Sequence, residues 1–563
     1  MAYIVGKKQD GKTYYYLVES ARVDGKPRIV SQRYLGPADE IVARLSQTGP
    51  GEPDRTRHLA FGDLAGGWAI LERLKVAEIV DDVVGPRRAD AAASVGTYIA
   101  LATANRVVDP RSKRAFSAWW ASTAGDRFVK LPAAALDHRR FWDAMDQISE
   151  SQLAEIERRI VTAMVETFEV DLSGLVLDMT NFATYIDSAN DRAPIAQRGH
   201  AKQKRTDLRL VGLGLVVSTD GGIPLVSHAY AGDRPDVSQF PHIVKELVSR
   251  FTALADHVGE LTLVFDAGQN SADNVELFDD SPLHFVGSLP PSDHPDLLAV
   301  TTDRYRPVDQ ARFPGLTAFE TTKVVFGEQR RIVVTHSANL HDKQSRGFDQ
   351  TLAKARRQLC ELAARLARGR TRKPRDKVEA EIDTILKPRW VSRVISTTLV
   401  GEGPADLRLT WRTKPKARAA LEDELFGKRI LFSDKHRPTT AEIVADYRSQ
   451  SQVEGDFRQM KDPHVVSFSP MFHWTDHKIR VHTFYCVLAL TVARLMVRQA
   501  DRAGLHMSVR ELLDTLAGIQ ETVLLYQGER GRPRARRMLT QIDPTQQRLY
   551  NIFGLDRYTP AGP

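Results

Sequence analysis

The feature that most limits the fold of this chain is a pair of aspartates set at two very apolar, β-rich runs. Asp178 follows the run at 174–177 (GLVL), and Asp266 closes the run at 261–265 (LTLVF). Burying a carboxylate beside a sheet core is costly unless it is ion-paired, hydrogen-bonded or bound to a metal. One such residue is more often a loop cap than a catalytic group. Two on apparently central strands of one domain favour a shared site, because adjacent strands can bring their carboxylates close together.

The residues around these aspartates predict an α/β layered domain that starts near Leu172. Two strand patterns, at 174–186 and 208–232, are followed along the chain by a helical pattern at 236–258. A further strand pattern then ends at Asp266. Within the second pattern, Asp220-Gly221-Gly222 marks a hairpin turn. Antiparallel strands, a helix and a further apolar strand in this order are typical of α/β domains.

The chain before this domain divides into two parts. Residues 1–50 predict a β-meander with tight turns at Asp10-Gly11 and Asp24-Gly25. Five tyrosines and several basic residues on it leave two interpretations open, a sheet that lies on DNA or a solvated basic face. The stretch at 49–54 (GPGEPD) reads as a linker. Residues 56–170 follow helical periodicity, with Trp119-Trp120 expected in the core.

The chain after residue 300 changes character again. Residues 300–430 predict an inserted, β-rich domain with a basic segment at 353–377, where ten Lys/Arg and two Asp/Glu give 10 − 2 = +8, as much as the formal charge of the whole chain. Residues 431–505 return to helical patterns and form a second part of the α/β domain. Residues 506–563 form a C-terminal region that contains an arginine-rich loop at 528–537.

Composition narrows the class of protein. A content of 42% hydrophobic and 27% charged residues excludes a chain that is disordered throughout. Two distant cysteines, Cys360 and Cys486, cannot build a disulfide framework or a cysteine zinc site. Arg494 interrupts the apolar run at 483–497, which therefore predicts a buried helix and not a membrane span. No P-loop or dinucleotide motif supports ATP or NAD use, and we expect a cytoplasmic protein.

A third carboxylate, Glu454, lies in a predicted helix. Tyr447, Gln450, Glu454, Arg458 and Lys461 are spaced by three, four, four and three residues, so that they share one helix face. This pattern is also typical of a surface helix in which Glu454 and Arg458 form a salt bridge.

The spacing Tyr447-x2-Gln450-x3-Glu454-x6-Lys461 resembles the tyrosine–arginine–glutamate–lysine signature of bacterial insertion-sequence transposases of the DDE type. Gln450 stands where that group usually has arginine, and Arg448 lies two residues earlier. The segments LDMTNF, AYAGDRPD, FDAGQNSADN and MFHWTDHKIRVHTFYCVLAL add to the resemblance in the same order. It covers roughly residues 172–500.

This resemblance implies an α/β fold with an RNase H-like catalytic domain, in which Asp178, Asp266 and Glu454 bind two Mg²⁺ ions, with Mn²⁺ as a substitute. The separations are 266 − 178 = 88 and 454 − 266 = 188 residues. The second gap is far longer than one crossover helix needs, which agrees with an inserted domain at 300–430. Two such ions can activate the attacking oxygen and stabilise the leaving oxygen of a phosphodiester.

The expected partner is double-stranded DNA, both the terminal inverted repeats of the element and the target, bound by a homodimer in the bacterial nucleoid. Basic residues would hold phosphates. Trp390 and Trp411 of the inserted domain would stack on an extruded base, although a tryptophan in a β-rich domain is more often part of the core. The residues expected to contact DNA are Tyr447, Gln450, Arg458, Lys461, Arg356, Arg357, Arg370, Arg372, Lys373, Trp390 and Trp411.

The function that these expectations define is that of a transposase, which cuts DNA ends by metal-dependent hydrolysis and joins the 3′-OH to target DNA. Two alternatives stay open. An RNase H-like nuclease or resolvase would use the same three acids without strand transfer. A domesticated transposase that only binds DNA would have no use for three carboxylates opposite the DNA.

Overall fold

The computed structural model describes residues 2–23, 26–46, 52–199, 207–252, 261–279, 281–370, 372–526 and 534–560. The chain divides into two compact units. The first is built from Met1–Ala69, Ser117–Leu131 and Arg510–Pro563, and the second from Ile70–Phe116 and Pro132–Val509. The predicted active-site residues all belong to the second unit.

The first unit contains the predicted meander. Strands β1 (Ala2–Gln9), β2 (Lys12–Val23) and β3 (Lys26–Pro37) pair antiparallel in that order, and α1 (Ala38–Ser46) follows. Asp10 and Gly11 have φ of 51° and 76°, the left-handed conformation that a tight hairpin turn requires, so the predicted turn is confirmed. The Asp24-Gly25 turn and residues 49–51 of the predicted linker lie outside the described residues.

A second small sheet of this unit differs from the sequence prediction. It has the order β17 (Arg534–Leu539), β16 (Gln520–Tyr526), β4 (Arg55–Ala60), so the region predicted as helical from residue 56 begins with a strand. The predicted arginine-rich loop becomes a strand from Arg534 onward. Both differences have one cause, because β4 and β17 are strands only through pairing with β16. Trp119 and Trp120 are buried, as predicted.

The second unit is built on a nine-stranded mixed sheet, which confirms the α/β class. Among the described strand pairs of this sheet, only β5–β8 and β8–β9 are parallel. The strands lie in the order β10 (Arg306–Pro307), β11 (Leu316–Val325), β12 (Glu328–Ser337), β15 (Lys428–Ser433), β9 (Leu283–Leu289), β8 (Leu261–Phe265), β5 (Gly174–Thr184), β6 (Arg209–Ser218), β7 (Pro224–Ala231). Gly221 and Gly222, both at positive φ, form the predicted turn between β6 and β7.

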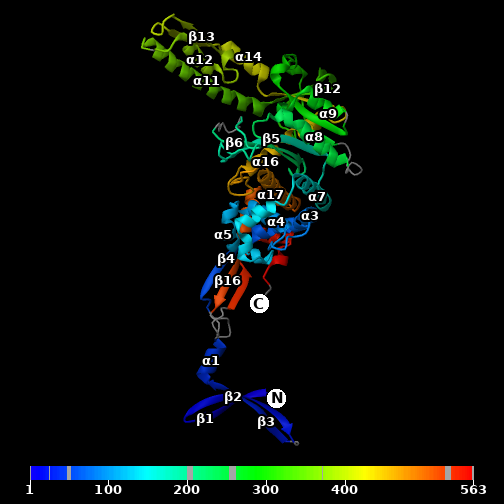
Figure 1. Cartoon of the computed structure of the whole chain (residues 1–563), viewed down its shortest axis with the longest axis vertical. Helices are drawn as coiled ribbons and strands as arrows, with labels where there is room; N and C mark the ends of the chain where they lie inside the picture. Colours follow the sequence, from blue (N-terminus) through cyan, green and yellow to red (C-terminus); the bar gives the residue numbers. More distant parts are fainter. Residues whose placement is uncertain are drawn as a thin grey trace. The chain divides into compact units, whose positions relative to one another are not determined.

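Helices pack on this sheet and on one another (Figure 1). An aromatic cluster joins Phe240 of α8, Phe278 of α9 and Phe265 of β8. The remaining α-helices of the chain, apart from those of the insertion, are α2 (Gly62–Arg73), α3 (Val76–Val84), α4 (Val95–Val108), α5 (Phe116–Ala121), α6 (His138–Met145), α7 (Glu150–Phe168), α8 (Asp236–Thr252), α9 (Ala272–Asp279), α10 (Pro295–Leu298), α15 (Thr440–Arg448), α16 (Gln450–Met460), α17 (Asp476–Arg502), α18 (Val509–Ala517) and α19 (Pro544–Phe553).

Helix α17 is the apolar helix that the sequence predicts at 483–497. It is long and apolar enough to cross a membrane by length and composition alone, but 89% of its most apolar window is buried inside the structure. Its contacts include α4, α7, α16 and β7. The prediction of a buried helix is therefore confirmed.

The inserted region is mainly helical, and not β-rich as predicted. Strands β10, β11 and β12 belong to the main sheet because β12 pairs with β15, so the helical insertion starts only at Ala338. It comprises α11 (Ala338–Ala367), α12 (Arg375–Leu386), α13 (Val391–Val394), α14 (Pro415–Leu425) and the ribbon β13 (Ile395–Val400) and β14 (Arg408–Thr413), which lie together in Figure 1. The apolar side chains of these helices alternate with charged ones at helical spacing.

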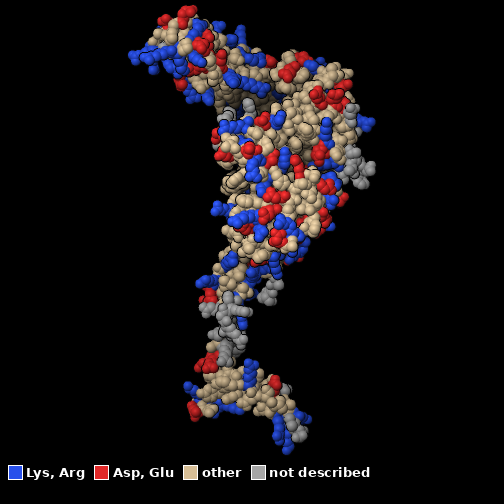
Figure 2. Space-filling model, in the orientation of Figure 1, with Lys and Arg blue, Asp and Glu red and all other residues tan. Residues whose placement is uncertain are grey.

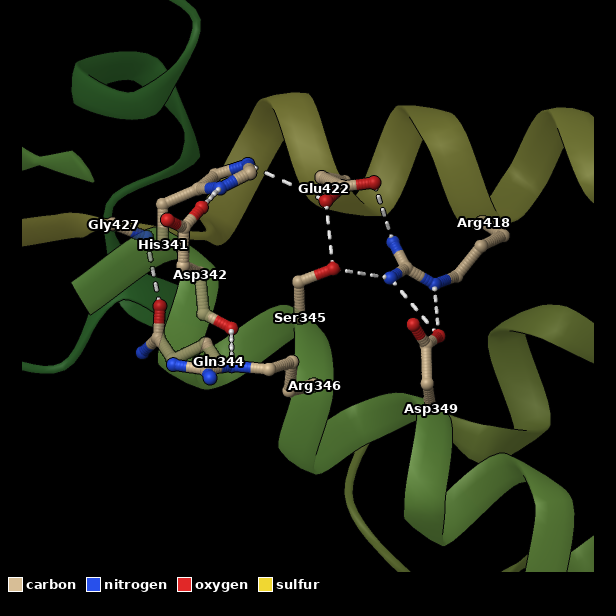
Figure 3. A network of polar contacts seen from close by, with 9 residues as sticks. All are labelled: His341, Asp342, Gln344, Ser345, Arg346, Asp349, Arg418, Glu422 and Gly427. Carbon is tan, nitrogen blue, oxygen red and sulfur yellow. Dashed lines mark hydrogen bonds and ion pairs between the residues drawn. The ribbon is translucent and has the colours of Figure 1, made fainter. Parts of the chain in front are cut away.

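Polar contacts attach α14 to the first half of α11 (Figure 3). Arg418 of α14 donates to Asp349 and to the Ser345 hydroxyl of α11, at 3.1 and 2.8 Å. Ser345 in turn donates to Glu422 at 2.9 Å, and the Gly427 N–H donates to the Gln344 side chain at 2.7 Å. The start of α11 is thereby held against the strand β15 that follows α14.

Candidate active site

Asp178 lies on β5, and Asp266 directly follows β8, the parallel strand next to β5 in the central sheet. In the β5–β8 pair Val176 is opposite Val264, so each aspartate stands two positions beyond the same pair of residues. Paired strands run about 4.8 Å apart, and residues two positions apart share a face. Asp178 is half-buried and Asp266 is exposed at the end of β8. The sheet therefore brings together two acids that are 88 residues apart in the sequence (266 − 178).

Hydrogen bonds orient the Asp266 carboxylate. Its Oδ1 accepts from the Ser288 hydroxyl at 2.8 Å and from the Tyr447 hydroxyl at 3.3 Å. The Ser288 oxygen also accepts from the Ala267 N–H at 3.2 Å, which fixes the start of the loop after β8. Because Ser288 lies on β9, the strand next to β8, the sheet itself holds the carboxylate in place.

The predicted single helix with five functional residues is divided in two. Helix α15 ends at Arg448, α16 begins at Gln450, and the Ser449 N–H between them donates to the carbonyls of Ala445 and Asp446 in α15. Tyr447 is consequently buried on α15 against Asp266 and does not share an exposed face with Glu454. Burial, and then the nearby Asp266 charge, raise the pKa of the Tyr447 hydroxyl, so this group stays protonated and able to donate.

Lys461 lies close to the aspartate on β5. It follows the last residue of α16, and its Nζ donates to the Thr180 hydroxyl at 2.7 Å. Thr180 is two residues beyond Asp178 on β5 and so faces the same side of the sheet. The ammonium is thus held beside the acid pair, where it would attract an anionic group.

Glu454 lines a separate pocket of about 280 Å³, which is also bordered by Tyr447 and Gln450. It is exposed, and no ion pair joins it to Arg458; instead Arg458 donates from Nε to the backbone carbonyl of Glu454 at 3.4 Å. The alternative of a Glu454–Arg458 salt bridge is therefore not found. Tyr447 contacts Asp266 and borders this pocket, so it links the two acidic positions.

The acids satisfy the expected metal site only in part. Within the described ranges, no group of three or more His, Cys, Asp or Glu side chains lies close enough to hold a metal ion. Asp178 and Asp266 fit a divalent cation by donor type, since hard cations select carboxylate oxygens, and by their position on adjacent strands. Glu454 is not gathered with them in this structure.

The predicted DNA contacts of the insertion separate into exposed and packed residues. Arg356, Arg357, Arg370, Arg372 and Lys373 are all exposed, and Lys373 is also ion-paired with Glu381 at 2.9 Å. Figure 2 shows Lys and Arg intermixed with Asp and Glu over α11, α12 and α14.

Neither tryptophan of the insertion stands free as a stacking platform. Trp390 packs against Phe348 and Phe426, with ring centroids 6.2 and 5.4 Å away, and Arg389 covers its ring. Trp411 is half-buried on the ribbon β13–β14. Both placements favour a packing role over the predicted stacking on an extruded base.

Sequence reasoning missed two residues at the site, Ser288 and Arg429, and named Arg448 without giving it a role. Ser288 gives no local signal because its partner Asp266 lies on another strand. Arg429 and Arg448 border the same pocket as Glu454, although Arg429 lies outside the helical signature. A search for polar residues at the register position beside Asp266 could have found Ser288, but nothing in the sequence pairs Arg429 with Arg448.

Comparisons with known proteins give matches among solved structures alone. No family model and no curated protein matches the chain. Among solved structures, it is similar to the piggyBac transposase in a cryo-EM structure of its synaptic complex with hairpin DNA, at 9% identity and a TM-score of 0.38. The match covers 83% of this chain and 82% of that one. The proposals below rest on the geometry of the site and not on this similarity.

Proposed function

We propose that this chain is a DDE-type transposase with an RNase H-like catalytic domain, which cuts double-stranded DNA at the ends of an insertion sequence and joins them to target DNA. The observation that carries the proposal is the pair of carboxylates at adjacent parallel strands, Asp178 on β5 and Asp266 directly after β8, with Lys461 hydrogen-bonded to Thr180 on β5. A carboxylate pair next to a fixed cation matches the needs of phosphodiester transfer.

Each residue has a defined part in this proposal. Asp178 and Asp266 would hold Mg²⁺ or Mn²⁺, which when bound lowers the pKa of water and offsets charge on the phosphate. Ser288 and Tyr447 keep the Asp266 carboxylate oriented through their hydroxyl groups. Lys461 attracts the phosphate that is attacked, and Glu454 would complete the acidic set. Such a protein would act on two DNA ends as a homodimer in the bacterial cytoplasm.

The test is a cleavage and strand-transfer assay on duplexes that carry the element's ends, with Mg²⁺ or Mn²⁺, comparing the natural chain with Asp178→Asn. We expect the natural chain to cut and join, and the variant to bind the duplex with unchanged affinity but to do neither. The substitution removes a metal ligand but leaves the contacts to the DNA phosphates intact. The variant should therefore lose cleavage and joining without losing its affinity for DNA.

Other outcomes decide against parts of the proposal. Cleavage without joined products would favour the nuclease or resolvase alternative. Binding by both proteins without any reaction would favour a protein that only binds DNA. Full activity of Asp178→Asn would remove the strand aspartates from the mechanism.

A further inference from the structure

The pocket beside Glu454 collects positive charge from two elements. Arg429 extends from β15 and Arg448 from the end of α15, and both border the same 280 Å³ volume. Arg429 lies 5.5 Å from the ring centroid of Tyr447, and Arg448 lies 4.5 Å from that of Phe313. Each guanidinium is thereby seated on an aromatic face, which fixes its position without neutralising its charge.

Neither guanidinium has a carboxylate partner within the described part of the chain. Three other arginines of this unit near the sheet do have one: Arg330 pairs with Asp279, Arg331 with Glu320, and Arg494 with Asp456. Arg429 and Arg448 border one pocket, and burial, followed by the Arg429 charge, lowers the pKa of Arg448. Two like charges held together without a counter-ion form a surface that favours an anion.

The remaining lining also suits an anion with several oxygen atoms. Ser337 and Leu340 border the pocket, and Ser337 caps the first turn of the 30-residue helix α11. The start of a long helix carries partial positive charge. Glu454 supplies the one acidic side chain among the lining residues, so two arginines and one glutamate leave a net charge of 2 − 1 = +1. The Gln450 amide can donate a hydrogen bond to the same guest.

We infer that Arg429 and Arg448 form a phosphate-binding site that holds a backbone phosphate of the bound DNA strand beside Glu454. Planar guanidinium groups bind phosphate oxygens through paired N–H donors, which is why two of them can fix one phosphate in orientation. The inference rests on the proposed function for its ligand, since a free phosphate has the same chemistry. DNA and inorganic phosphate are therefore separate arms of the test.

The experiment measures affinity for a fluorescent duplex against salt concentration, without divalent metal so that no cleavage occurs. Each backbone phosphate contact contributes about 1 to the slope of log affinity against log salt. We expect Arg429→Ala/Arg448→Ala to lower this slope by about 1, because the two side chains hold one phosphate. The control Arg88→Ala/Arg139→Ala removes the same charge from exposed positions of this unit and should leave the slope unchanged.

Two further measurements keep the inference falsifiable. Arg429→Lys/Arg448→Lys retains the charge and should retain most of the slope, which covers the case in which the alanine variant does not fold. Inorganic phosphate should raise the thermal stability of the natural chain more than that of the alanine variant. If phosphate stabilises the natural chain but the alanine variant keeps the full DNA slope, the site takes free phosphate and the inference is overturned.

The result also separates this inference from the proposed function. If the natural chain cleaves DNA while the alanine variant binds and cleaves equally well, the phosphate site is wrong and the catalytic proposal stands. If no protein cleaves but the slope falls by about 1 in the alanine variant, as expected, the phosphate site stands and the catalytic proposal fails.

Discussion

The helical insertion and the pocket beside Glu454 both present arginine to solvent, but on surfaces of different form. On α11 and the segment after it, the cations stand on a convex helix, and part of them are neutralised by α12: Arg365 and Lys373 by Glu381, and Arg375 by Glu379. In the pocket, Arg429 and Arg448 converge on one volume and have no described acidic partner. The ten basic residues of the segment at 353–377 therefore indicate a phosphate-binding site less clearly than Arg429 and Arg448, which border one pocket.

The physical reason lies in solvation. An exposed cation on a convex surface is surrounded by water and screened by salt, so its attraction for DNA is weak and independent of sequence. Arg429 and Arg448 are also exposed, but they border one pocket, so that a single anion can contact both. The first surface would raise affinity for any DNA, and the second would position one phosphate.

The largest effect should come from the acid in the pocket. Glu454→Gln should lower the cleavage rate at least about 100-fold, the loss that removal of one charge-stabilising group causes. Metal-free affinity for DNA should rise, because the one negative charge of the lining is gone. Rate and affinity are measured on the same duplex, and a fully active variant would show that Glu454 takes no part in the reaction.

A smaller effect should follow from the hydroxyl behind Asp266. Ser288→Ala should lower the cleavage rate by about 10- to 100-fold, the usual cost of losing a group that orients a metal ligand, with DNA affinity unchanged. Ser288→Thr keeps the hydroxyl and should recover most of the rate. The exposed Ser292→Ala serves as control. Equal loss in the alanine and threonine variants would point to packing instead of orientation.

The exposed arginines of α11 and of the segment after it should influence the affinity for DNA and not the cleavage rate. Arg356→Ala/Arg357→Ala/Arg370→Ala/Arg372→Ala should weaken binding to all duplexes alike and lower the salt slope by up to about 1 per arginine. The cleavage rate at saturating DNA should not change, because none of these residues approaches the carboxylates. A lower saturated rate would make the insertion part of the reacting site and would remove the contrast between the two surfaces.

The smallest expected effect concerns groups that are buried in the core, where a positive charge is neither exposed nor available to DNA. Lys113, whose Nζ has no hydrogen-bond partner in the part of the chain that the structure describes, lies over the Tyr485 ring. His473 and His482 pack against each other in the same region, 5.1 Å between ring centroids. Burial, with the nearby Lys113 and Arg106 charges, lowers the pKa of His473 to about 3, and burial lowers that of His482 well below its usual value.

The sign of the resulting pH dependence is fixed. Below the ordinary histidine pKa of about 6.5, the unfolded chain binds protons that the folded chain excludes, so the free energy of unfolding falls as the pH drops from about 6.5 toward 3. His473→Gln should reduce this slope, whereas exposed His464→Gln should not. Denaturant titrations across this pH range measure it. An unchanged slope in His473→Gln would show that His473 is protonated in the folded state.

Local patterns in the sequence correctly predicted several parts of the fold. They include the α/β class, the turns at Asp10-Gly11 and Gly221-Gly222, and the buried helix α17. Each depends on residues near one another in the chain, on backbone preferences or on a continuous apolar run. The strand positions of Asp178 and Asp266 follow from the same kind of signal. Their catalytic roles, and that of Glu454, stay predictions.

Tertiary structure decided the rest. It placed β10 to β12 in the main sheet and made β4 a strand, because hydrogen-bonding partners far along the chain complete these ladders. It also divided the predicted helix at Ser449 and directed Tyr447 to Asp266. The sequence by itself indicated which carboxylates could take part in catalysis, because Asp178 and Asp266 each follow an apolar run. Only the packing of β15 against α15 decided that Arg429 and Arg448 meet, because charge convergence depends on distance in space, which residue spacing along a chain does not contain.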